Sequence, residues 1–190
     1  MNGQRIKKVG VWLLALSLFA AHIVFRTAAD AAEPQNDKAW SQVVPRAGEC
    51  TISFPVNPEV SRQRLPIGSG QTLDYDVYVA PVEKEGVCLL LIAHYPMQLA
   101  KGQERAGLEG LLRGLVGHNP ENKLLFAKLF QLQGKLAIDF MIESGDHVFR
   151  GQALMVGNKL YLIAYEGRGQ TFQEAGFQKF ATSFKLNADL

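Results

Sequence analysis

The chain has 190 residues, of which 47% are hydrophobic and 20% are charged. This balance is too apolar for a disordered chain and too mixed for a protein that crosses a membrane many times. Its two cysteines exclude a disulfide-dense miniprotein and are too few for a four-cysteine zinc site. Length and composition therefore predict one globular domain with an additional segment.

The additional segment is at the N-terminus and has the three parts of a secretory signal peptide. A cationic start precedes the apolar run Val9–Ala21, and small residues follow it. We predict a signal peptide over residues 1–31, cleaved after Ala29 or Ala31, and export to the periplasm or out of the cell. The alternative is an uncleaved membrane anchor at residues 9–25, which is at the short limit for a span.

Removal of this leader changes the charge of the protein. The whole chain has 20 basic and 18 acidic residues; four of the basic and one of the acidic lie in residues 1–31, so the remainder carries 16 and 17, a net charge of −1. Without a positive field, the electrostatic basis for binding nucleic acid is missing. Binding to anionic lipid is disfavoured for the same reason, so we expect membrane contact only through an uncleaved leader.

Two cysteines in an exported domain are candidates for a single disulfide between Cys50 and Cys88. Closing a loop of that size would constrain the unfolded chain by about 3–4 kcal/mol. The alternative is two buried free thiols, because Cys50 shares a strand face with Ile52 and Cys88 opens an apolar run. Both interpretations stay open, since sequence cannot place the two α-carbons.

After a polar linker over residues 32–39, the pattern is that of one domain over residues 40–188. Alternating and continuous apolar runs predict the first strands, at residues 49–54, 72–79 and 87–94. Ile67–Gly70 is predicted as a turn.

Leucines at helical spacing predict an amphipathic helix over residues 108–116. Glycines fall on the side of this helix opposite the leucine stripe: Gly107, Gly110, Gly114 and Gly117. Each glycine inside a helix costs about 1 kcal/mol relative to alanine. The side that carries them is interpreted either as a poorly formed outer face or as a contact face that a partner's backbone approaches closely.

Four strand-like segments follow, separated by short turns, at residues 122–132, 135–143, 146–156 and 159–166. Short turns between such segments predict an antiparallel meander. Thr171–Glu174 matches a capping box, and Phe177, Phe180 and Phe184 have the spacing of a closing helix. The fold class is therefore α+β, a mostly antiparallel sheet with helices packed on its faces.

No pattern in the chain matches a catalytic or cofactor-binding motif, so we predict no enzyme activity and no cofactor. The histidines of the domain lack the spacing of a metal site. Asp74 and Asp76 share one strand face and are candidates for binding a hard cation or a basic partner; the alternative is a pair of solvated carboxylates.

Three segments of the domain resemble the PsbP-like superfamily: Gly48–Pro55 as a glycine, strand and proline opening, Gly157–Leu162 as a hairpin into a strand, and Phe180–Phe184 as a closing helix. The resemblance covers about residues 40–187. It implies an α/β/α sandwich that acts without catalysis, as an extrinsic subunit, an assembly factor or a binding module. No manganese or calcium site of a photosystem is matched, so no functional residue is carried over.

These observations predict an exported, non-enzymatic binding or assembly module of the cell envelope whose partner is unknown. The alternative is a carrier of a small apolar ligand held between sheet and helix. A third interpretation is a hydrolase whose polar residues are dispersed along the chain.

Overall fold

The computed structural model describes five stretches of the chain, residues 40–46, 49–68, 70–82, 86–97 and 102–187. The predicted signal peptide and linker lie outside these residues, so the leader, its cleavage and the domain boundaries stay predictions. Within the described stretches, no helix combines the length and the apolar character needed to cross a membrane.

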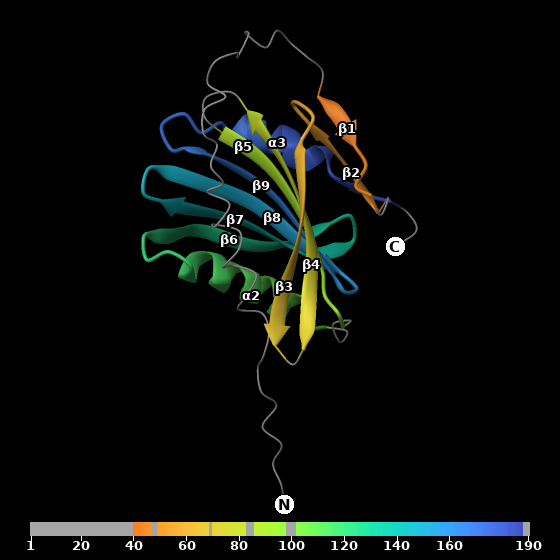
Figure 1. The fold of residues 1–190 in the computed structure, drawn as a ribbon. Helices are drawn as coiled ribbons and strands as arrows, with labels where there is room; N and C mark the ends of the chain where they lie inside the picture. The colour runs from red at the N-terminus through yellow and green to blue at the C-terminus, as the bar shows by residue number, and fades with distance from the viewer. Residues whose placement is uncertain (1–39, 47–48, 69, 83–85, 98–101, 188–190) are drawn as a thin grey trace, which may run out of the picture.

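Seven antiparallel strands form one large twisted sheet (Figure 1), in the spatial order β3-β4-β5-β9-β8-β7-β6. Their bounds are β3 Glu59–Gly68, β4 Gln71–Val82, β5 Gly86–His94, β6 Asn122–Leu132, β7 Lys135–Ser144, β8 His147–Val156 and β9 Lys159–Arg168. The predicted four-stranded meander is confirmed as β6 to β9. Its first turn contains Gln133 and Gly134, both with positive φ, as a tight hairpin turn requires.

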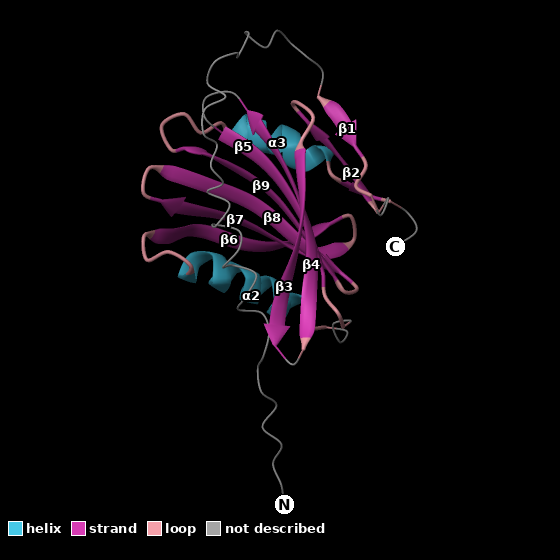
Figure 2. Cartoon of the chain, in the orientation of Figure 1, coloured by secondary structure: helices cyan, strands magenta, loops and turns pink. Residues whose placement is uncertain are grey.

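Each face of the large sheet is covered by a helix (Figure 2), as the apolar character of both faces requires. Helix α2 (Glu104–Gly117) packs on β6, β7 and β8. On the other face lie helix α3 (Glu174–Ser183) and a small sheet made of three strands, β1 (Ser41–Val43), β2 (Cys50–Phe54) and β10 (Lys185–Leu186). The α+β prediction is confirmed.

The sheet separates two apolar cores. Under α2, leucines of the helix pack with the apolar face of β7, including Ile138, Phe140 and Ile142. Under α3, Phe177 and Phe180 pack with residues of β2, β5 and β9. Full burial of one such side chain stabilises the fold by about 1.5–3 kcal/mol.

One local prediction is wrong, and two strands have no sequence pattern that predicts them. Strand β3 was not predicted, because its alternating side chains are mostly polar and it lies at the edge of the sheet. The capping box is not formed: α3 begins after Gln173 with no side-chain cap, and Thr171 Oγ1 lies 3.5 Å from the carbonyl of Arg168. Strand β10 is too short to leave a periodic pattern.

The glycines of α2 do not form an outer face. Gly110 and Gly114 are buried together with Leu108, Leu111 and Leu115. Gly107 is half-buried, and Gly117 is exposed. Burial thus extends beyond the leucine stripe to two of the four glycines. The contact face predicted for these glycines stays a prediction.

Of the two interpretations left open for the cysteines, the structure shows the free thiols and no disulfide. Cys50 on β2 and Cys88 on β5 are free thiols, fully buried in the core under α3. Burial raises the pKa of each thiol to about 12, so both stay protonated and unreactive at neutral pH.

Candidate functional site

Charged and polar side chains line up across four strands on the α3 side of the large sheet. The strand register pairs Arg64 of β3 with Asp74 of β4, Asp74 with His94 of β5, and His94 with Lys159 of β9. Because residues opposite one another on neighbouring strands point to the same face, these four side chains form one row. We call Arg64, Asp74, His94 and Lys159 the charged row.

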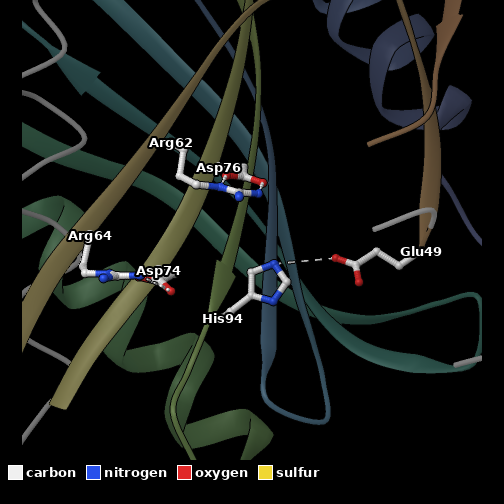
Figure 3. Close-up of polar contacts among 6 residues, drawn as sticks. All are labelled: Glu49, Arg62, Arg64, Asp74, Asp76 and His94. Atoms are coloured by element: carbon white, nitrogen blue, oxygen red, sulfur yellow. Dashed lines mark hydrogen bonds and ion pairs between the residues drawn. The ribbon is translucent and has the colours of Figure 1, made fainter. Parts of the chain in front are cut away.

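The row runs from solvent toward the core under α3. The exposed fraction of the side chains falls from 71% for Arg64 to 48% for Asp74, then to 35% for His94 and 22% for Lys159. Glu49, which is 3% exposed, closes the inner end. Its carboxylate accepts a hydrogen bond from Lys159 Nζ, and its Oε1 lies 3.8 Å from His94 Nε2 (Figure 3).

A second ion pair lies beside the outer end of the row (Figure 3). Arg62 Nε and Nη2 donate to the two carboxylate oxygens of Asp76 at 2.7 and 2.8 Å. Arg64 makes the same kind of contact with Asp74, at 2.7 and 3.4 Å. Hydrogen bonds from these arginines lower the pKa of both carboxyl groups.

The two candidate carboxylates of the sequence, Asp74 and Asp76, thus have a basic partner within the chain. Among the described residues, no three His, Cys, Asp or Glu side chains are arranged to hold a metal ion. Arg62, Arg64 and Asp74 present charges of both signs to solvent, whereas the side chain of Asp76 is only 13% exposed.

At the inner end of the charged row, Glu49 connects the small sheet to the large sheet. The backbone carbonyl of Glu49 accepts a hydrogen bond of 3.0 Å from the amide of Asn187, so the residue also holds the end of β10. Burial and the Glu49 carboxylate raise the pKa of the neighbouring Tyr161 hydroxyl. A buried carboxylate with a cationic partner on another sheet is a structural anchor at the border of an exposed polar surface.

Arg150 of β8 forms a second polar cluster, which is buried under α3. Its guanidinium donates to Asp139 and, at 3.0 Å, to the carbonyl of Phe140. The group lies between two aromatic rings, 4.8 Å from the centroid of Phe126 and 4.4 Å from that of Phe177. Arg150 therefore joins the edge strand β6 to α3, and its 5% exposure leaves it no contact with a partner.

A cavity of about 300 Å³ lies beside α3 and the small sheet. Its walls include Trp40, Val82, Tyr165 and Gly176, and Lys179 Nζ lies 4.7 Å from the centroid of the Trp40 ring. The volume is at the lower end of the range for small-molecule sites. Aromatic walls with one cationic side chain make this cavity a candidate for a small ligand.

Comparison with known proteins shows the fold. The structure is similar to the solution structure of cyanobacterial PsbP (CyanoP) from Synechocystis sp. PCC 6803, with a TM-score of 0.55 and 11% identity, over 83% of this chain and 98% of that one. A crystal structure from Bacteroides thetaiotaomicron matches with a TM-score of 0.40 and 8% identity, over 80% of this chain and 50% of that one. No protein-family model and no curated protein matches the chain. The chain therefore has a PsbP-like fold, as its resemblance to that superfamily implied.

The sequence contains a local signal for the ion pairs at the outer end of the charged row. The turn predicted at Ile67–Gly70 closes the β3–β4 hairpin. In that hairpin Arg62 faces Asp76 and Arg64 faces Asp74. The equal spacing of two arginines and two aspartates about one turn predicts both ion pairs once the hairpin is assumed. Glu49 and Lys159 are 110 residues apart, and only the fold brings them together.

Proposed function

We propose that the chain is an exported, non-enzymatic binding or assembly module of the cell envelope. The observation that carries this proposal is the PsbP-like fold, which extends over 98% of the cyanobacterial chain. The superfamily that the sequence resembles acts through contacts rather than catalysis. The leader predicted over residues 1–31 supports export.

The outer end of the charged row is the contact surface that we propose for this module. Arg62, Arg64 and Asp74 are exposed, and the ion pair of Arg64 with Asp74 costs little to rearrange because solvent already screens it. Charges at the rim of an interface act mainly on the rate of association and on the choice of partner.

The proposal is tested by fractionation of cells and by site-specific cross-linking in the same cells. A photo-reactive amino acid is placed at Arg64, and as a matched control at Arg113, which is exposed on α2. We expect the protein in the envelope fraction and one discrete cross-linked complex from position 64 that position 113 does not give. A cytoplasmic protein, or the same products from both positions, contradicts the proposal.

The cavity beside Trp40 favours a second candidate function, a carrier of a small ligand. Its walls combine aromatic rings with the Lys179 ammonium group, so a planar molecule with one acidic group fits their chemistry. A small molecule of defined mass that stays with the purified protein, and is lost in Trp40→Ala, would support this candidate. Loss in a Phe126→Ala control as well would indicate a global effect on the fold.

A further inference from the structure

The outer edge of β6 exposes more large apolar side chains than β3, the opposite edge of the large sheet. The strand pairs with β7 on one side only, so half of its backbone N–H and C=O groups point away from the sheet. Large apolar side chains are exposed along it, with 43% exposure for Leu124, 50% for Leu125 and 38% for Phe126.

The opposite edge, β3, is protected in the way that natural sheets protect their edges. It carries Arg62 and Arg64, which are both ion-paired, and Pro66, which has no N–H group to donate. On β6 the single irregularity is the register shift between Leu124 and Phe126. Beyond it the strand is regular from Phe126 to Leu132 and contains no proline.

The regular part of β6 has a distinct pattern on the α3 side of the sheet. The register places Phe126, Lys128 and Phe130 on this side, opposite Met141, Asp139 and Ala137 of β7. The two carboxylate oxygens of Asp139 are both occupied by Arg150. Lys128 therefore forms no ion pair with any residue in the described part of the chain, although it is exposed.

We propose that β6 accepts an extended segment of a partner protein as an additional strand. On the face next to α3, that segment has an acidic side chain opposite Lys128 and apolar side chains opposite Phe126 and Phe130. Main-chain hydrogen bonds to the free edge provide the attachment, and the apolar, acidic, apolar order at alternate positions provides the specificity. This inference rests on one premise of the proposed function, that the chain binds another protein.

The charges of β6 favour such a partner over a second copy of this chain. The strand carries Lys123 and Lys128 and no acidic residue. Pairing of two copies through this edge would bring four lysines to the new strand pair without adding a carboxylate. Like charges on neighbouring strands destabilise the pair, whereas one acidic residue opposite Lys128 stabilises it.

The test measures binding of two labelled peptides to the full chain by fluorescence anisotropy. The peptides are Thr-Val-Thr-Glu-Thr-Val-Thr and the same peptide with lysine in place of glutamate. We expect the acidic peptide to bind about tenfold more tightly than the basic one. Lys128→Glu should reverse that order, whereas Lys185→Glu, an equal change of charge at an exposed position of β10, should leave it unchanged. A variant that merely unfolds cannot gain affinity for the basic peptide.

Hydrogen exchange locates the bound peptide. We expect slower exchange of the amides of residues 126–131 when the acidic peptide is added.

Equal affinity for both peptides, no effect of Lys128→Glu, no binding at about 1 mM, or protection confined to the charged row would each overturn the inference. A dimer of the free chain that Leu125→Glu dissociates would also overturn it, since a second copy would then occupy the edge. Cross-linking from position 64 is independent of all these results, so the proposed function can stand if this inference fails.

Discussion

Replacement of Glu49 by glutamine tests the anchor at the inner end of the charged row. The change keeps the size of the side chain and removes the charge that Lys159 and His94 face. A hydrogen bond between charged groups contributes about 1.5–3 kcal/mol to stability, and its loss leaves Lys159 without a counter-ion. Because Lys159 is 22% exposed, water can solvate part of the freed ammonium group.

We therefore expect Glu49→Gln to lower the free energy of unfolding by about 2 kcal/mol, which corresponds to a fall of about 4–8 °C in Tm for a domain of this size. Urea titrations of Glu49→Gln, Lys159→Met and the double variant give the coupling energy of the pair. The matched control is Glu143→Gln, which removes an exposed pair with Lys123 at 3.7 Å and should cost less than about 1 kcal/mol. A coupling energy no larger than the loss of unfolding free energy in Glu143→Gln would refute the assignment of Glu49 as an anchor.

Two substitutions and one labelling experiment test other parts of the structure. Asp76→Asn should cost about 0.5–1 kcal/mol at neutral pH. Arg62 lowers the folded pKa of this carboxyl group below 3.8, so the difference in unfolding free energy between the original protein and Asp76→Asn should shrink as pH falls through the folded pKa. A difference in unfolding free energy that persists in acid would argue against the ion pair. Gly151→Ala should cost about 1–3 kcal/mol in urea, since a β-carbon there would lie 2.5 Å from Phe140 Cζ; unchanged stability would show that the ring moves aside freely. Without reductant, the two cysteines should react with a thiol reagent only after unfolding, and an absence of thiols in the unfolded chain would establish a disulfide.

The meander was predictable because its information is local. Strands β6 to β9 are joined by tight turns, and each turn contains a glycine with positive φ that the sequence already shows: Gly134, Gly145 and Gly157. The leucine stripe of α2 likewise identified its core-facing side. Strand β3 was not predictable from alternation alone, since an edge strand whose outward residues are arginines has few apolar positions to mark it.

The burial of the glycines in α2 depended on tertiary contacts, which a helical wheel does not contain. The wheel places Gly110 and Gly114 away from the leucines, yet both are buried. The outcome for the cysteines depended on geometry in the same way. Cys50 and Cys88 belong to one apolar core, yet membership of a core does not bring two sulfur atoms to bonding distance.

The candidate site likewise combines contacts that local spacing predicts with contacts that only the fold creates. The pairs of Arg62 with Asp76 and of Arg64 with Asp74 follow from one hairpin, and local spacing contains them. Glu49, His94 and Lys159 come from three separate segments, and they meet because β5 and β9 are neighbours and β2 packs over them. Such long-range contacts are determined by the topology of the sheet.

Native mass spectrometry of the protein from its own envelope fraction, without reduction, tests whether the chain is exported and bound to another protein. We expect a chain that begins after Ala29 or Ala31, has two free thiols, and is bound to another protein. A chain that retains its leader, or one that carries only a small molecule of defined mass, would contradict the claim that this is an exported module that works by binding a protein.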